Sequence, residues 1–167
     1  MAVNRMRTLR GALAGGAAAA VWLVQQPLDK RVFECGHDDA RLLGRLAGGS
    51  PVLGAVLHLQ NGLVFGAVYA NLAPRLPGPA VLRGPLVALA EHVVTWPATA
   101  IVEPSLLGSR RAFAQSAWRH LLFGVVLGEL ERRWNPPSEL EPVSDAAVKS
   151  NGHGSVEHLV ASGPDAR

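Results

Sequence analysis

The sequence has little cysteine and little charge for its length. Cys35 is the single cysteine among 167 residues, which excludes an internal disulfide and any multi-cysteine metal site such as a zinc finger. Charged residues make up 17% of the chain, against about 25% in a soluble domain. Two long segments, 11–28 and 51–74, contain no Asp, Glu, Lys or Arg. A chain so short of water-facing side chains is expected to lie in a membrane.

The sequence also lacks the signatures of the common enzyme classes. It contains no Walker loop, GxGxxG, GxSxG or protein-kinase motif, so no catalytic residue is predicted. The net charge of +3 does not indicate nucleic-acid binding, because the arginines flank apolar segments instead of forming one basic face. Arg5, Arg7 and Arg10 precede the first apolar segment, and Arg132 and Arg133 follow the last.

Four apolar segments are long enough to cross a bilayer, which needs roughly 20 mainly apolar residues. They cover about residues 9–28, 51–73, 80–102 and 112–130. The links between the last three are short and contain proline, which predicts antiparallel hairpins. The first segment resembles a signal peptide, but three further spans keep the chain in the membrane in either case. We therefore predict an all-α fold, a four-helix transmembrane bundle over residues 1–133.

Two polar segments lie outside the predicted spans. Residues 29–50 are expected to form a short interfacial helix that is capped near Asp38 or Asp39 and ends at Gly48. The "CGHDD" run at its start resembles a metal-ligand cluster in composition, but a polar turn that caps the helix explains it better. Residues 134–167 are polar and rich in turn formers, and they are predicted to be a disordered tail.

Small residues follow one face of each predicted span, and three of the four spans place a histidine on that face. In the second span, steps of four give Gly54, His58, Gly62, Gly66 and Ala70. His92 and His120 have similar settings in the third and fourth spans. Small residues let membrane helices approach closely. The predicted packing glycines are Gly54, Gly62, Gly66, Gly124 and Gly128.

Further polar residues accompany the histidines inside the spans. The predicted buried polar belt comprises His58, Gln60, Asn61, Glu91, His92, Thr95, Arg119 and His120. An arginine at the centre of a membrane helix costs about 2.5–3.5 kcal/mol, so it normally turns inward and finds a partner. Counting residues from the ends of an antiparallel hairpin places Glu91 and Arg119 about 6 Å apart in depth. Glu91 is therefore the predicted partner of Arg119.

The belt admits three interpretations. It is either a network that fixes helix register, a site on a proton or solute path, or a set of ligands for haem or a transition metal. No spacing such as HExxH supports the last, so no metal ligand is assigned and the cofactor stays unknown. The functions that correspond are a non-enzymatic scaffold or partner subunit, a small transporter or proton conductor, and a haem- or metal-binding membrane protein. Expected partners are the lipid bilayer and another membrane protein or a second copy.

The location follows from the flanking charges and from a resemblance. Lys and Arg number eight on the side of the N-terminus and six on the other, which favours both termini in the cytoplasm. The stretches "PLDKRVF", "HLQNGLVFGAVYANLAP" and "RRAFAQSAWRHLLFGVVLGELERR" together resemble small four-span actinobacterial membrane proteins over residues 10–133. That resemblance implies a multi-pass protein of the bacterial plasma membrane. It does not identify any catalytic residue.

Overall fold

The structure is a computed structural model that describes residues 4–136, and within this range it contains helices and turns but no strand. The prediction of an all-α fold is confirmed. The helices are α1 (Arg5–Val32), α2 (Asp39–Leu46), α3 (Pro51–Leu72), α4 (Ala80–Val102) and α5 (Arg110–Trp134). Two 3₁₀ turns, Ala73–Arg75 and Pro104–Leu106, follow α3 and α4. The predicted tail lies outside the described residues beyond residue 136.

Polar side chains cap four of these helices at their first turns. Asn4, Ser50 and Ser109 each accept a hydrogen bond from a backbone N–H three residues on, at the starts of α1, α3 and α5. Asp38 does the same for α2, which confirms the predicted cap. The helix ends at Leu46, before Gly48, whose φ of 106° is the left-handed conformation that favours glycine.

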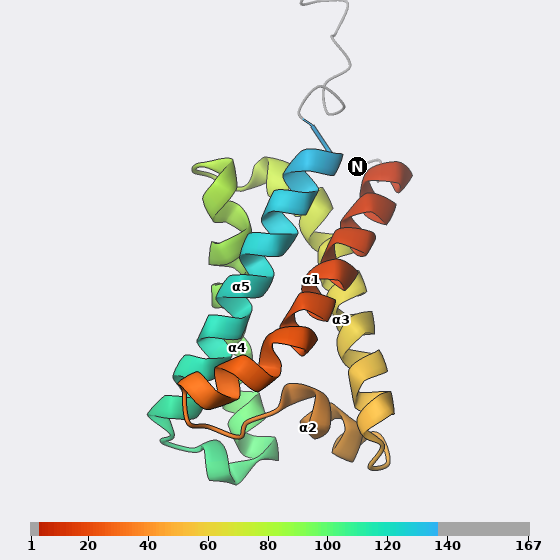
Figure 1. The fold of residues 1–167 in the computed structure, drawn as a ribbon. Coiled ribbons are helices and arrows are strands. Elements are labelled where there is room, and N and C mark those ends of the chain that lie inside the picture. The colour runs from red at the N-terminus through yellow and green to blue at the C-terminus, as the bar shows by residue number, and fades with distance from the viewer. Residues whose placement is uncertain (1–3, 137–167) are drawn as a thin grey trace, which may run out of the picture. The chain divides into compact units, whose positions relative to one another are not determined.

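Helix α1 is longer than the predicted span of residues 9–28. It begins at Arg5 and continues through Pro27 to Val32, so it takes in charged residues at both ends. A span predicted from hydropathy stops where charged residues begin, whereas the backbone hydrogen bonds of the helix continue through those residues. Figure 1 shows the last part of α1 turning aside from the direction of the rest of the helix. Proline removes one backbone donor and clashes with the preceding turn, which accounts for a bend here.

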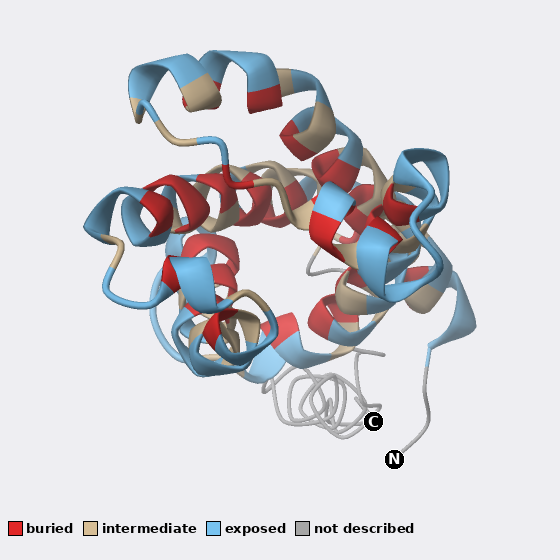
Figure 2. Ribbon diagram, turned by 90° about the horizontal axis from the view of Figure 1, so that it is seen from below, coloured by how far each residue is buried: buried red, intermediate tan, exposed pale blue. Residues whose placement is uncertain are grey.

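The four long helices alternate in direction, and α1 and α5 form the centre of the arrangement (Figure 1). Helix α1 packs along both α3 and α5, and α5 also packs along α4. Helices α3 and α4 are not packed closely against each other in the described part of the chain. Helix α2 packs on the start of α3, at the end of the bundle opposite the N-terminus. Seen along the bundle, buried residues face inward and exposed residues face outward (Figure 2).

Glycines mark the places where the long helices touch backbone to backbone. A Cβ atom on Gly15 or Gly66 would overlap backbone atoms of the facing helix in the α1–α3 pair. The α4–α5 pair makes the same kind of contact between Gly84 and Gly124. All five predicted packing glycines are buried at such contacts: Gly54 lies against α2, Gly62 and Gly66 against α1, and Gly124 and Gly128 against α4.

Two of the helices are long and apolar enough to cross a membrane. They are α3 with its following turn, Pro51–Arg75, and α4, Ala80–Val102. Helices α1 and α5 are long enough, but both carry charged residues inside or near their apolar stretches. Large apolar side chains are exposed on several helices, including Val24 on α1 and Val94 and Ile101 on α4. The composition of the helices therefore supports two spans, and four spans stay a prediction.

Candidate functional site

A pocket of about 320 Å³ lies between α3 and α4, with α5 behind it and α2 at one end. Six of the eight residues of the predicted polar belt line it: His58, Asn61, Glu91, His92, Thr95 and His120. The helical repeat explains the grouping, because residues three or four apart share a face. His58, Asn61 and Gly62 thus come from one face of α3, and His92, Thr95 and Thr99 from one face of α4.

The three histidines of the pocket lie close together around Trp22. The rings of His92 and His120 have centroids 4.7 Å apart and are tilted by 35°. Trp22 meets His58 and His120 edge to face, with centroid separations of 4.9 and 4.6 Å. Such edge contacts fix the orientation of each ring. Trp22 of α1 therefore holds the imidazoles of His58 and His120, while His92 packs against Trp96 and Phe113.

His120 is paired on both sides of its ring. Its Nε2 lies 2.9 Å from Oε2 of Glu91, and its Nδ1 lies 2.8 Å from the carbonyl oxygen of Ser116. The Glu91 side chain is 38% exposed, so the carboxylate stands at the mouth of the pocket. This pair joins α4 to α5 and leaves His120 without spare hydrogen-bonding capacity.

His58 and His92 are different, because each has a buried ring nitrogen without a partner. Nδ1 of His92 lies 3.3 Å from Oγ of Ser116, but Nε2 of His92 and Nε2 of His58 meet no hydrogen-bonding group among the described residues. His92 is 2% exposed and His58 is 9% exposed. A buried unpaired polar atom costs about 1–3 kcal/mol. Both nitrogens lie in the protein wall of the pocket, so a rotation of either ring is needed for it to hydrogen-bond to a molecule there.

Arg119 lies outside the pocket. Its side chain is fully buried and is paired with two carboxylates. Its Nε and Nη2 donate to the two oxygens of Asp29 at 2.6 and 2.7 Å, a bidentate pair, and its Nη1 donates to Asp39 at 3.0 Å. The carbonyl oxygen of His37 accepts a further bond from Nη2 at 3.0 Å. The prediction that Glu91 is the partner of Arg119 is wrong. Depth along a hairpin gives the level of a residue, but it does not give the direction in which its side chain points.

Sequence reasoning missed Asp29 as a site residue. Asp29 comes directly after the first predicted span, yet it is 1% exposed and also accepts hydrogen bonds from Gln25 and Gln115. The available signal was an arginine deep in one span together with an acidic residue at the end of another. A bent helix end is required to bring the two together, and the sequence does not give its direction.

The "CGHDD" turn does more than cap α2. Asp38 caps the helix and also binds Nζ of Lys30 at 2.6 Å, while Asp39 joins His37 and Arg119. Burial by itself would raise the pKa of both carboxyl groups. The contacts with Lys30, the Arg41 N–H and Gln26 together outweigh burial at Asp38, and those with His37, Arg119 and His120 do so at Asp39, so both pKa values fall below the usual 3.8.

Two residues of the predicted belt reach the outer surface of α3. Asn61 is exposed and lines the mouth of the pocket. Gln60 is exposed and lies outside the pocket, because one residue of helix turns its side chain by about 100° from the direction of Asn61. These adjacent amides thus occupy different environments.

No group of three His, Cys, Asp or Glu side chains in the described range is arranged to hold a metal ion. The rings of His92 and His120 also face each other too closely for a haem to lie between them. No protein-family model matches the chain, and no curated protein or solved structure shows significant similarity to it. The function must therefore be argued from the pocket and its surroundings.

Proposed function

We propose that the protein is a four-span integral membrane protein whose α3–α4 pocket binds a small molecule. It acts as a non-enzymatic binding component, and the resemblance to small four-span membrane proteins implies the bacterial plasma membrane as its location. The observation that carries the proposal is the pair of buried, unpartnered Nε2 atoms of His58 and His92 in one pocket.

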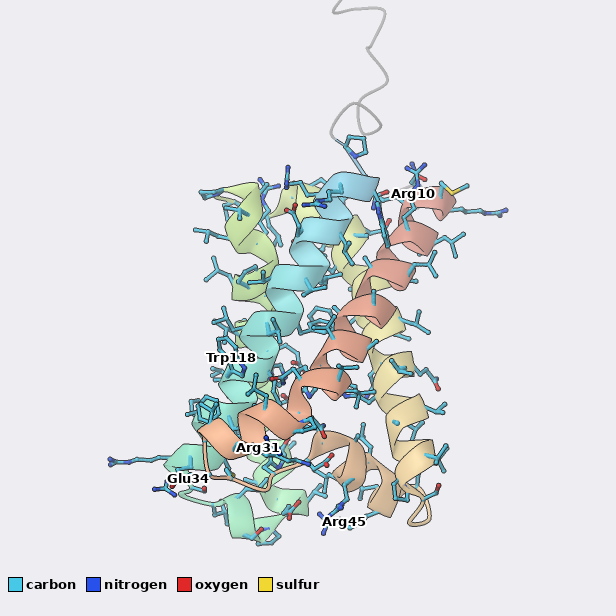
Figure 3. The ribbon with its side chains drawn as sticks, in the orientation of Figure 1. Arg10, Arg31, Glu34, Arg45 and Trp118 are labelled. Carbon is cyan, nitrogen blue, oxygen red and sulfur yellow. The ribbon has the colours of Figure 1, made fainter. Side chains whose placement is uncertain are left out.

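The distribution of charge supports four spans. Figure 3 shows Arg10 at one end of the bundle, Arg31, Glu34 and Arg45 at the other, and Trp118 projecting outward from α5 between them. The one charged group deep in α5, Arg119, is neutralised by Asp29 and has no exposed side-chain surface. An arginine that is paired and covered escapes much of the cost of lying in hydrocarbon. Helices α1 and α5 are therefore compatible with the membrane although their mean hydropathy is low.

The distribution of Lys and Arg supports the orientation with both termini in the cytoplasm. These residues number eight on the side of the N-terminus and six on the side that carries α2. Excess Lys and Arg mark the cytoplasmic side of a membrane protein.

A proton-conducting protein is the second candidate, and the Glu91–His120 pair beside His92 favours it. The core between this cluster and the N-terminal end of α1 opposes it. That core contains buried Ala88, Phe123 and Leu127, which offer no side-chain hydrogen bonds for proton transfer. A path that stops at an apolar layer suits binding better than conduction across the bilayer. Proton uptake by liposomes that contain the purified protein should match protein-free liposomes.

Cysteine accessibility tests the spans. In a Cys35→Ser background, Ser105→Cys places a thiol in the α4–α5 link and Pro77→Cys places one in the α3–α4 link, both exposed in the structure. A membrane-impermeant maleimide should label Ser105→Cys in intact cells and Pro77→Cys only after permeabilisation. Equal labelling of the two sites in intact cells would overturn the hairpin α3–α4 as a pair of spans. Release of the protein from membranes by alkaline carbonate would overturn membrane integration itself.

A further inference from the structure

The pocket opens sideways between the two most apolar helices. Helices α3 and α4 do not pack closely together in the described part of the chain, and the pocket lining includes exposed Asn61 from α3 and half-exposed Glu91 from α4. Both helices have the length and apolar composition of membrane spans. If they cross the bilayer as proposed, the mouth of the pocket faces lipid, and a ligand reaches it from the bilayer.

The size of the pocket limits what enters it. A volume of about 320 Å³ is at the lower end of the range of roughly 300–1,000 Å³ for small-molecule sites. It accommodates the head of an amphiphile and little of a long tail. The tail then extends from the mouth over the exposed apolar surface of α3 and α4, which includes Val64 and Val94.

The charge in the pocket is already balanced, which limits the charge of the head. Glu91 is paired with His120, and Asp39 is paired with Arg119 and His37. Arg119 bonds through all three of its nitrogens and so offers nothing to an anion. An anionic head would meet carboxylates without a spare cation, and a cationic head would have to compete with His120 for Glu91. A neutral head leaves both pairs intact.

We infer that the pocket binds the head of an uncharged amphiphile, with a hydroxyl or carbonyl group on an apolar tail, that enters from the bilayer between α3 and α4. The inference rests on the proposed membrane location. Nε2 of His58 and Nε2 of His92, which a rotation of each ring brings to the pocket surface, are the groups that hydrogen-bond to the head, because a neutral imidazole nitrogen either donates or accepts. Asn61 at the mouth supplies an amide that does both.

Three probes with one tail and different heads test the inference. They are 2-bromododecan-1-ol, 2-bromododecanoate and (2-bromoethyl)dodecyldimethylammonium, each with bromine next to the head so that it quenches tryptophan on contact. The full chain in lipid nanodiscs carries Trp118→Phe and Trp134→Phe, which removes two exposed tryptophans. Trp96 in the pocket lining and Trp22 behind the histidines remain as reporters. The neutral probe should quench saturably, and the charged probes should show only the linear quenching of lipid partitioning.

A matched pair of variants locates the binding. Asn61→Phe fills the mouth, whereas Gln60→Phe adds the same ring one residue away on the surface outside the pocket. Saturable quenching should disappear in the first variant and persist in the second. His58→Phe and His92→Phe keep a ring and remove the unpaired nitrogen. Each should weaken binding of the neutral probe by about three- to tenfold, the fold-change expected for one hydrogen bond.

The outcomes separate this inference from the proposed function. Saturable binding of the anionic or cationic probe that Asn61→Phe abolishes would overturn the uncharged head and leave a membrane pocket that binds ligands. Linear quenching by all three probes, unchanged by Asn61→Phe, would overturn lateral binding of any amphiphile. The cysteine labelling above decides the spans independently. A circular dichroism spectrum and elution volume like those of the parent are required of every variant, and Gln60→Phe controls for the added ring.

Discussion

The two ends of the helical bundle are held together in different ways. At the glycine end, where α1 begins, the long helices touch at Gly11, Gly15, Gly66, Gly84 and Gly128, with no room for a side chain between them. At the pocket end, where α2 lies, the helices part around a cavity, and a buried ion pair from α1 to α5 crosses behind it. Helices that approach most closely at one crossing point diverge on either side of it. Close packing at one end thus creates the space at the other.

The buried arginines of the two ends show the same contrast. Arg7, at the glycine end, binds Glu131 and the carbonyl oxygen of Ala70, but its Nη1 has no partner within residues 4–136. Arg119, at the pocket end, bonds through every nitrogen. A buried arginine with complete partners acts as a rigid connection between elements. We conclude that the long helices meet backbone to backbone at the glycine end, whereas at the pocket end a completely paired arginine joins α1 to α5 and the backbone contact, at Gly54, is between α2 and α3.

The largest expected effect comes from breaking the pair at the pocket end. Arg119→Leu leaves Asp29 buried without a cation, which should lower the free energy of unfolding by about 3–5 kcal/mol. Unfolding in mixed detergent and dodecyl sulfate micelles measures the loss. Arg111→Leu is the control on the same helix, because its pair with Glu34 is exposed and should contribute no more than about 1 kcal/mol. Similar losses in the two variants would mean that burial of Arg119 has no energetic consequence.

The next effect comes from the glycine end. Gly66→Ala places a methyl group against the backbone of Gly11 and Gly15. Overpacking of this kind should destabilise by about 1–3 kcal/mol, since α1 and α3 must move apart. Gly36→Ala adds the same methyl group in open space and is the control. If both variants unfold at the same detergent composition as the parent, the close contact of α1 and α3 is not present in the membrane.

A smaller effect is expected from pH, and part of it should come from the pocket end. Asp38 and Asp39 have pKa values below 3.8 in the folded protein, so the folded state binds their protons less tightly than the unfolded state. Their pairs stabilise the fold above about pH 3.8, and this contribution is lost as the pH falls below that value. The melting temperature between pH 7 and pH 3 should therefore drop more steeply for the parent than for Asp39→Asn. Parallel curves would contradict the assignment.

The smallest effect should come from Gln60, which lies on the outer surface of α3 beside the pocket. Gln60→Leu removes no contact of the structure and should change stability by less than about 0.5 kcal/mol. His58→Leu, two residues away on the buried face, should cost more because its ring packs against Trp22. Thermal unfolding of the two variants in the same detergent compares them. A larger loss for Gln60→Leu would show that Gln60, and not His58, faces the interior.

The sequence predicts the helices and their contact faces well and the ion pairs poorly. Four-residue spacing was sufficient to place His58, His92 and His120 together, because helical periodicity decides which residues share a face. The partner of Arg119 depends on the bent end of α1 and on the turn before α2, and their directions follow from tertiary packing. Local pattern therefore predicts what faces the interior, while partner choice between distant helices requires the fold.

The most direct test of the account is a pair of double-mutant cycles on Arg119, read as free energies of unfolding. One cycle combines Arg119→Leu with Asp29→Asn, and the other combines Arg119→Leu with Glu91→Gln. The structure predicts a coupling of about 1–3 kcal/mol in the first cycle and additivity within about 0.5 kcal/mol in the second, because Glu91 contacts His120 instead. Strong coupling between Glu91 and Arg119, with additive effects at Asp29, would contradict the arrangement of the pocket end.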